Sequence, residues 1–210
     1  MIEIRKYESG LLSSNMYVIV EGNHAIVIDP FKNTFVAQEL QIDYIFLTHE
    51  HYDHISGVNI WKEATGAPVL CSKACAKNIR SPKKNLANHF KEFCELQTWM
   101  KLDKIPVSDP AYSCSADKMF ENEILLQWQG HEFGLFEIPG HSQGSIGILL
   151  DSKDFFSGDS LIKNNEIELR MPGGSRKKWE EIGKNKLEAI PEGTRIWPGH
   201  FESFVWHRSS

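Results

Sequence analysis

The sequence from residue 48 to residue 54 is Thr48-His49-Glu50-His51-Tyr52-Asp53-His54. The imidazoles of His49, His51 and His54 and the carboxylate of Asp53 fall within six residues. Imidazole and carboxylate are the side chains that most often bind zinc and similar divalent ions. The apolar run 44–47 predicts a buried strand directly before them, so we expect the cluster at the mouth of that strand. A tight loop there can turn alternate side chains toward one point, which makes this stretch a candidate metal site.

Three later stretches repeat the order of an apolar run, a small residue and one metal-binding residue type. They are Pro139-Gly140-His141-Ser142, Ser157-Gly158-Asp159-Ser160 and Pro198-Gly199-His200-Phe201. A glycine permits a sharp turn with backbone angles that other residues avoid. We therefore expect three separate strands to bring His141, Asp159 and His200 to the mouth that holds residues 49–54. A polar loop of surface histidines is the alternative, and the recurrence of the pattern argues against it.

Together these motifs resemble those of the metallo-β-lactamase superfamily, and they occur in the family's order from about Asn15 to His200. The resemblance implies an α/β fold, namely a four-layered αββα sandwich with two mixed β-sheets. It also implies two metal ions. The implied ligands are His49, His51 and His141 for one ion and Asp53, His54 and His200 for the other, with Asp159 bridging both. By the same resemblance, Asp29 at the end of an early strand supports the histidine loop from outside the ligand set.

The residues and the resemblance predict an enzyme with two divalent metal ions, most simply zinc, with iron or manganese as alternatives. Only two carboxylates, Asp53 and Asp159, offset the ions, so the centre keeps a positive charge. This suits a substrate that gains negative charge, and a metal-bound water loses its proton near pH ~7 rather than ~15.7. We expect a metal-dependent hydrolase in which a metal-bridging hydroxide attacks a small thioester, ester or lactone. Asp53 is the predicted catalytic residue, because it would orient the hydroxide and accept a proton.

The residue at the bridging position indicates a branch of the superfamily. Antibiotic-hydrolysing members usually carry cysteine or serine where this chain has Asp159, whereas glyoxalase II, lactonase, phosphodiesterase and nuclease relatives carry aspartate. The runs 139–145 and 171–175 also resemble small glyoxalase II-like proteins. Residues 167–170 depart from that pattern, because they read Ile-Glu-Leu-Arg where Gly-Arg-Thr/Ser-Asp is usual. The chain ends ten residues after His200, so we expect no C-terminal helical domain to grip glutathione.

Three other functions stay open. An iron-dependent persulfide dioxygenase resembles glyoxalase II but uses one iron, and the retention of every second-site ligand argues for two metals. A phosphodiesterase or nuclease would share the metal site, but the nucleases add a second domain and a basic surface that this sequence does not show. A noncatalytic binding module would keep the fold alone, and the complete ligand set weighs against it.

Composition limits the partners. The chain has 210 residues, 41% hydrophobic and 24% charged, which is typical of one globular domain over residues 1–210. The net charge of −5 argues against a nucleic-acid partner, so we expect a small-molecule substrate, and the oligomeric state is not indicated. No long apolar run or secretory signal is present, which predicts no membrane association. The spacing of Cys71, Cys75, Cys94 and Cys114 predicts reduced thiols in a cytoplasmic protein.

Hydrophobic patterning and turn residues predict the remaining elements. The predicted strands are 16–20, 25–28, 44–47, 69–70, 124–128, 133–138, 146–150, 154–157 and 195–197. The predicted helices are 35–40, 54–64 and 176–190, with a mixed helical region over 72–108. Within that region, segment 81–109 is expected to form a lid or pocket wall, or else an ordinary helical insertion.

Several side chains outside the motifs are also assigned. We expect Tyr52 and Trp206 near the site, and His24, His131 and His207 in solvent. His89 lies in the mixed helical region, where it could line the cleft.

Overall fold

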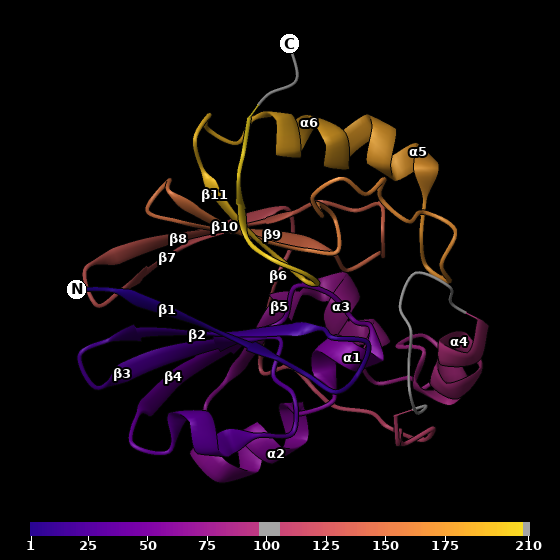
Figure 1. The fold of residues 1–210 in the computed structure, drawn as a ribbon, viewed down its shortest axis with the longest axis horizontal. Helices are drawn as coiled ribbons and strands as arrows, with labels where there is room; N and C mark the ends of the chain where they lie inside the picture. Colours follow the sequence, from indigo (N-terminus) through magenta and orange to yellow (C-terminus); the bar gives the residue numbers. More distant parts are fainter. Residues whose placement is uncertain (97–105, 208–210) are drawn as a thin grey trace.

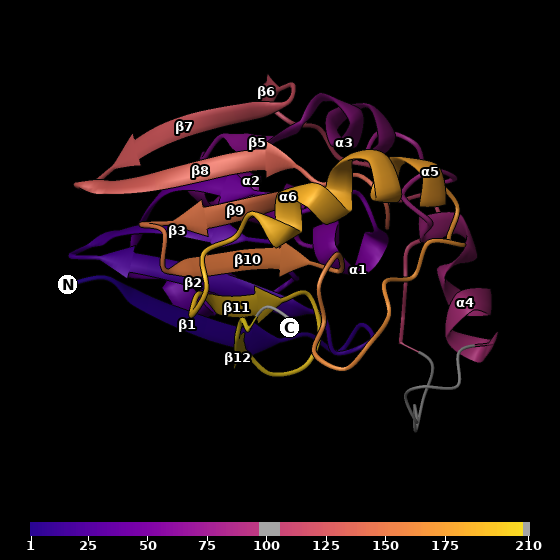
Figure 2. The same ribbon diagram turned by 90° about the horizontal axis from the view of Figure 1, so that it is seen from above.

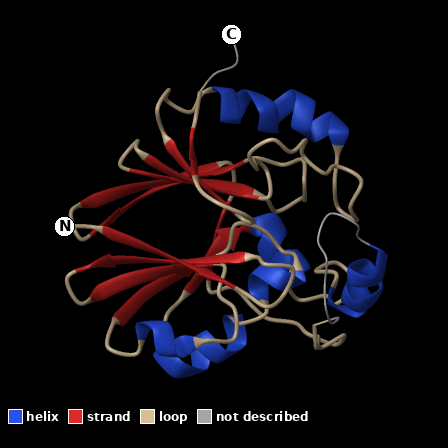
Figure 3. Cartoon of the chain, in the orientation of Figure 1, coloured by secondary structure: helices blue, strands red, loops and turns tan. Residues whose placement is uncertain are grey.

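Two β-sheets face each other, with helices on their outer sides (Figures 1 and 3). The computed structural model describes residues 1–96 and 106–207. The first sheet holds, from edge to edge, β1 (Glu3–Glu8), β2 (Asn15–Glu21), β3 (His24–Ile28), β4 (Gln41–Phe46), β5 (Val69–Ser72) and β6 (Lys118–Phe120). The second sheet holds β12 (Phe204–Val205), β11 (Arg195–Pro198), β10 (Asp154–Gly158), β9 (Ile146–Leu150), β8 (His131–Glu137) and β7 (Glu123–Trp128).

Both sheets are mixed. Strands β1, β2 and β3 pair antiparallel, whereas β3, β4, β5 and β6 pair parallel. In the second sheet, β10 and β11 pair parallel and the other neighbours pair antiparallel. Helix α2 (Val58–Thr65) covers the outer side of the first sheet, and α6 (Lys184–Glu188) covers that of the second (Figure 1). The predicted four-layered αββα sandwich with two mixed sheets is confirmed.

Three hydrophobic clusters fill the three interfaces between these layers. Along β2, Tyr17 and Ile19 face the second sheet while Val18 and Val20 face the helical layer, because successive side chains of a strand point to opposite faces. The cluster between the sheets includes Ile26, Phe46, Phe133, Ile148 and Phe156. The cluster below α6 consists of Ile138, Phe155, Leu187, Ile190 and Ile196. A strand that is buried on both faces reads as a continuous apolar run, which is why 16–20 was readable as a strand.

The functional loops gather at one end of the sandwich. Figure 2 shows α1 (Tyr52–Ile55), α3 (Lys73–Asn78) and α4 (Phe90–Leu96) together at the end away from the N-terminus. The loops that follow β4, β8, β10 and β11 end there as well. None of the helices in the described part of the chain has the length and apolar character to cross a membrane.

The predicted helix 54–64 is wrong as a single element. It is broken into α1 and α2, because the chain at Gly57 packs directly against the backbone of Phe31. A Cβ at Gly57 would lie 2.4 Å from the Phe31 carbonyl carbon, and the Gly57 amide donates to the carbonyl of Pro30 at 2.8 Å. Only glycine allows the two backbone segments to come so close. The periodicity of the sequence does not predict this contact.

Other differences are smaller. The predicted helix 35–40 is one 3-10 turn, η1 (Thr34–Ala37), capped by the side chain of Asn33. The predicted helix 176–190 exists as α5 (Arg176–Lys178), a π-helical turn (η3, Trp179–Gly183) and α6. Strands β1, β6 and β12 were not predicted. Strand β1 is a charged edge strand, as edges often are, and the other two have only three and two residues.

Candidate metal centre

The seven predicted ligand residues lie together at the mouth of the sandwich. His49, His51, Asp53 and His54 belong to the loop after β4 and to α1, while His141, Asp159 and His200 follow β8, β10 and β11. All seven side chains are at most 13% exposed. Strand ends therefore deliver these residues to one place, as the sequence pattern predicts.

Two groups of ligand atoms stand out. In the first group, one ligand atom each from His49, His51 and His141 lies within 4.8 Å of the others, and His51 Nδ1 is 3.0 Å from His141 Nε2. The second group is formed in the same way by Asp53, His54 and His200. In it, His54 Nε2 lies 3.4 Å from both Asp53 Oδ2 and His200 Nε2.

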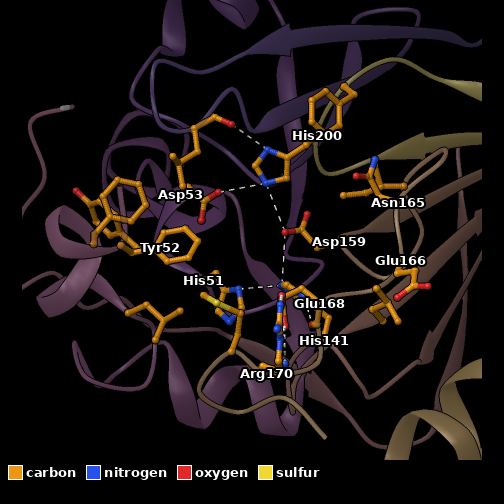
Figure 4. A pocket seen from close by; sticks show the side chains of 18 residues that line it. His51, Tyr52, Asp53, His141, Asp159, Asn165, Glu166, Glu168, Arg170 and His200 are labelled. Atoms are coloured by element: carbon orange, nitrogen blue, oxygen red, sulfur yellow. Dashed lines mark hydrogen bonds and ion pairs between the residues drawn. The ribbon is translucent and has the colours of Figure 1, made fainter. Parts of the chain in front are cut away.

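Asp159 lies between the two groups and contacts both (Figure 4). Its Oδ2 is 3.4 Å from His141 Nε2 in the first group and 3.4 Å from His200 Nε2 in the second. Its Oδ1 is 3.4 Å from His54 Nε2. One carboxylate is thus placed to serve two ions at once.

The spacing of these atoms fits bound ions better than hydrogen bonds. N–H···O bonds are about 2.7–3.2 Å long, whereas five of the contacts around Asp53 and Asp159 are 3.4–3.5 Å. Ligands about 2.0–2.1 Å from a tetrahedral zinc are about 3.3 Å from each other. Moreover, His49 Nε2 and Asp159 Oδ1 are buried and have no hydrogen-bond partner among the described residues, which is rare for buried polar atoms. The residues present therefore fit a pair of metal ions.

Three of the histidines are held in one orientation and one tautomer. His141 Nδ1 donates to the carbonyl of Glu168 at 3.0 Å, and His200 Nδ1 donates to the carbonyl of Leu12 at 3.0 Å. His54 Nδ1 donates to the carboxylate of Asp29 at 3.1 Å. Because these oxygens only accept, each Nδ1 carries a proton, which leaves Nε2 as the ring nitrogen that can bind a metal. Such outer partners are what orient histidine ligands in metal proteins.

Asp29 extends this support to the first group. Its carboxylate accepts from the Thr48 amide at 2.7 Å and from the Thr48 hydroxyl. Since that hydroxyl donates to Asp29, its oxygen accepts from His49 Nδ1 at 3.0 Å, which leaves His49 Nε2 as the lone-pair atom. Asp29 therefore lies where the resemblance to the superfamily places it, outside the ligand set and against the histidine loop.

Burial and charge act differently on the histidines. Burial, with neighbouring imidazoles, holds the pKa values of His49 and His51 well below the usual range, so both are neutral and able to bind a metal. Burial also opposes the charged form of His54, but Asp53 and Asp159 outweigh it and raise the pKa of His54 to about 10. The carboxylates of Asp53 and Asp159 thus favour a positive charge at the second group.

Two glycines allow the close packing of these loops. A Cβ at Gly199 would lie 2.1 Å from Asp159 Oδ1, so a side chain there would displace the shared carboxylate. Gly158 has a φ of +50°, and its Cβ would lie 2.7 Å from the Thr48 hydroxyl oxygen. The glycines of the strand-end pattern are therefore required both by backbone conformation and by space.

Glu50 is a residue that sequence reasoning missed. Glu50 is 1% exposed and does not line the cavity beside the ligands. Oε2 accepts from the Ser142 hydroxyl at 2.8 Å and from the Gly144 amide at 3.1 Å, and Oε1 accepts from Asn78 Nδ2 at 2.8 Å. This carboxylate ties the loop of His49 and His51 to the loop of His141. A charged residue between two ligands was the only sign in the sequence, and it does not identify the partners.

We expect Glu50→Ala to lower both stability and metal binding. The change leaves buried donors of Ser142, Gly144 and Asn78 without an acceptor, which costs about 1–3 kcal/mol for each group that water cannot reach. We therefore expect the free energy of unfolding to fall by about 3 kcal/mol, measured by urea denaturation, together with reduced metal content. Glu50→Gln should lose less, because its amide oxygen still accepts. Exposed Glu188→Ala is the matched control, and an equal loss in that variant would refute the role of Glu50.

A cavity of about 490 Å³ opens beside the ligands. Its floor contains His51, Asp53, His141, Asp159 and His200, whereas His49 and His54 do not line it. One wall is formed by Leu86, Phe90 and Phe93, which belong to segment 81–109. Residues 97–105 of that segment lie outside the described residues, so its predicted role as a lid stays a prediction.

The other assigned side chains have mixed outcomes. Tyr52 lies at the site as expected, because it lines the cavity and its hydroxyl accepts from the Asp109 amide at 3.0 Å. The placement of Trp206 near the site is wrong. Its indole packs on the cluster of Ile138 and Phe155 below α6. His89 does not line the cavity, although Leu86 and Phe90 in the same segment do.

The three histidines expected in solvent are all paired with carboxylates. His24 and His131 are only partly exposed, with Nδ1 atoms 2.8 Å from Asp43 and 2.6 Å from Asp151. For these two the prediction is met only in part, because carboxylates on a neighbouring strand or turn pair with the rings, and the sequence alone does not show this pairing. His207 is exposed as expected and lies 2.8 Å from Glu192.

Comparison with known proteins adds a family and a fold. The family model described as "Metallo-beta-lactamase superfamily" matches residues 9–200. A protein of Streptococcus pyogenes named "Probable metallo-hydrolase" is 25% identical over 208 residues, which are 95% of this chain and 84% of that protein. A hydroxyacylglutathione hydrolase of Cereibacter sphaeroides is 30% identical over 199 residues, which are 90% of this chain. The alignment covers 63% of that hydrolase, so the chain spans less than two thirds of its length.

Solved structures show the same architecture. The crystal structure of BLEG-1 B3 metallo-beta-lactamase matches with a TM-score of 0.80 at 24% identity and covers 98% of this chain and 94% of that one. The crystal structure of TTHA1623 in a di-iron-bound form matches with a TM-score of 0.72 at 24% identity and covers 96% of this chain and 94% of that one.

Proposed function

Because the chain belongs to the metallo-beta-lactamase superfamily, we propose that it is a two-metal hydrolase of a small thioester, ester or lactone. The observation that carries the proposal is the pair of ligand groups joined by Asp159, since one carboxylate contacts histidines of both groups. The relatives named as a metallo-hydrolase and as a hydrolase of hydroxyacylglutathione, an acyl substrate, support it. The aspartate at position 159 argues against an antibiotic as the substrate.

The donor set decides which residues would hold the ions. His49, His51 and His141 would hold the first, Asp53, His54 and His200 the second, and Asp159 both. When bound, two divalent ions acidify water and polarise the carbonyl of a substrate. Imidazole-rich sites suit zinc, which we propose as the metal. Because one solved structure with this fold is in a di-iron-bound form, the metal analysis must also measure iron.

Asp53 is the residue that we propose to move the proton. Its carboxylate lines the cavity but is only 7% exposed, and Oδ2 is 3.5 Å from His200 Nε2. A carboxylate at this place can accept a proton from water that attacks the substrate and pass it to the leaving group. Because Asp53 is almost fully buried, its charge acts more strongly than it would in bulk water.

We expect Asp53→Asn to lower kcat by about 10²-fold or more while the fold is kept. Asparagine has the same shape but cannot accept the proton, and general acid–base catalysis contributes about 10²–10⁴-fold. Steady-state kinetics and metal content of the same sample give the measurement. Full activity with full metal content would show that Asp53 has no catalytic role.

The function is tested by metal analysis of the purified protein together with a panel of substrates. The panel holds thioesters, lactones, phosphodiesters and a β-lactam, and an oxygen electrode follows a glutathione persulfide sample. We expect hydrolysis of thioesters or lactones that depends on metal content. Hydrolysis of phosphodiesters alone, or oxygen uptake with one iron per chain, would replace the proposed acyl hydrolysis while leaving the fold and the ligand groups intact.

A further inference from the structure

The cavity beside the ligands has apolar walls. Phe90 and Leu86 are buried in one wall, and Phe93 lies partly exposed beside them. Ile162 and Ile167, in the segment between β10 and α5, also line the cavity. Figure 4 shows Glu166, the neighbour of Ile167 in the chain, across the cavity from Tyr52, whose ring contacts Phe90. Figures 1 and 2 place α4 and this segment at the same end of the sandwich. A group that projects from the ligands into the cavity therefore meets hydrocarbon on two sides.

The charged side chains at the rim of the cavity have a negative net charge. Apart from the ligands, the charged residues that line it in the described part of the chain are Glu166, Glu168 and Arg170. Arg170 Nε and Nη2 donate to the two oxygens of Glu168 at 3.0 and 2.8 Å, and this pairing lowers the pKa of Glu168 to about 2. The pair is neutral as a unit, so Glu166 leaves one net negative charge. The sum stays the same if Arg170 turns to another partner.

We propose that the substrate is a neutral acyl thioester, ester or lactone with an apolar acyl arm, and that the rim disfavours an anionic leaving group. This inference rests on the proposed hydrolysis at the same site. The arm would lie between Phe90 and Phe93 on one side and Ile162 and Ile167 on the other. A leaving group with a net negative charge, such as glutathione or coenzyme A, would meet one arginine and two carboxylates at the rim.

The volume of the cavity limits the length of the acyl arm that it can hold. At about 490 Å³ it is in the range of pockets that enclose drug-sized ligands, of about 300–1,000 Å³. An arm of several methylene groups fits such a space. Each buried methylene is expected to raise kcat/KM about fourfold until the cavity is filled.

The first test uses unbranched acyl thioesters of N-acetylcysteamine, which is neutral, from acetyl to octanoyl, with the metal-loaded protein. The same acyl groups on glutathione and coenzyme A give the anionic series. We expect kcat/KM to rise about fourfold per methylene and to be at least tenfold higher for the neutral thiol. A flat neutral series, or preference for either anionic thiol, would overturn the inference and leave the proposed hydrolysis standing.

A binding measurement separates this inference from the proposed function. S-alkyl thioethers of N-acetylcysteamine cannot be hydrolysed, and their Kd for the metal-free and metal-loaded protein is measured by calorimetry. If longer chains bind more tightly but no thioester is hydrolysed, the proposed function is wrong and the inference of an apolar binding cavity is supported. Hydrolysis without any dependence of Kd on chain length would do the opposite.

Two variants locate the effect. Phe93→Ala should reduce the gain in kcat/KM to less than twofold per methylene. Phe35→Ala is the control, because Phe35 is 78% exposed and does not line the cavity, and it should keep the fourfold gain. Glu166→Lys should raise kcat/KM for glutathione thioesters relative to neutral ones about tenfold at low salt, and added salt should reduce the gain. An unchanged slope in Phe93→Ala, or an unchanged preference in Glu166→Lys, would contradict the assigned walls and rim.

Discussion

Asp159→Asn is expected to lower kcat/KM for the best acyl substrate by about 10³-fold or more. The loss corresponds to about 4 kcal/mol of transition-state stabilisation, which is of the size that a metal centre supplies. The physical reason is that Asp159 contacts histidines of both ligand groups at 3.4 Å, so an uncharged amide weakens the hold on both ions. Metal content, measured by mass spectrometry on the same sample, should fall below that of the unmodified protein.

Asp151→Asn is the matched control for this change. Asp151 is also an aspartate that pairs with a histidine, His131, at 2.6 Å, but it lies at the turn after β9, away from the cavity. We expect its activity to stay within about twofold. If Asp159→Asn kept both its activity and its metal, Asp159 could not be the shared ligand, and the account of the centre would be wrong.

Removal of the metal ions is expected to abolish hydrolysis and to lower the Tm by at least about 10 °C. An ion present at a thousandfold over its Kd stabilises the folded state by about 4 kcal/mol. For a chain of 210 residues, each kcal/mol corresponds to roughly 2–4 °C. Dialysis against dipicolinate, followed by calorimetry and assay, gives the measurement.

Reloading decides whether the loss reflects the ions or damage by the chelator. Two equivalents of zinc per chain should restore both the activity and the Tm, and Asp159→Asn should show a smaller Tm shift with chelator. Hydrolysis that persists in the dialysed protein, with metal content near zero, would exclude metal-dependent catalysis.

The ligand residues at the mouth of the sandwich could be predicted from the sequence, because each belongs to a short local pattern. A strand that is buried on both faces is a short apolar run, and a ligand after a small residue at its end shows in four residues of sequence, as at Gly140-His141 and Gly199-His200. Residues that meet across the sandwich leave no such local sign. Glu50 looked like a spacer between two histidines, yet it accepts from Ser142 and Asn78, which come from two other segments.

The same limit explains the errors. The break between α1 and α2 comes from the approach of Gly57 to Phe31, a contact that exists only after β3 and β4 have paired. Trp206 was expected near the site, but it follows β12 and packs on the cluster below α6. His131 was expected in solvent, and Asp151 reaches it only because β8 and β9 pair. Each of these depends on a tertiary contact rather than on the residues nearby.

The central claim is that two groups of ligands, joined by Asp159, hold two metal ions. Its most direct test is the metal-to-protein ratio of the chain purified without chelator, measured by inductively coupled plasma mass spectrometry after loading and desalting. We predict two ions per chain for the unmodified protein and fewer for Asp159→Asn. A ratio near zero, or a ratio of one that no loading raises, would contradict the two-metal centre.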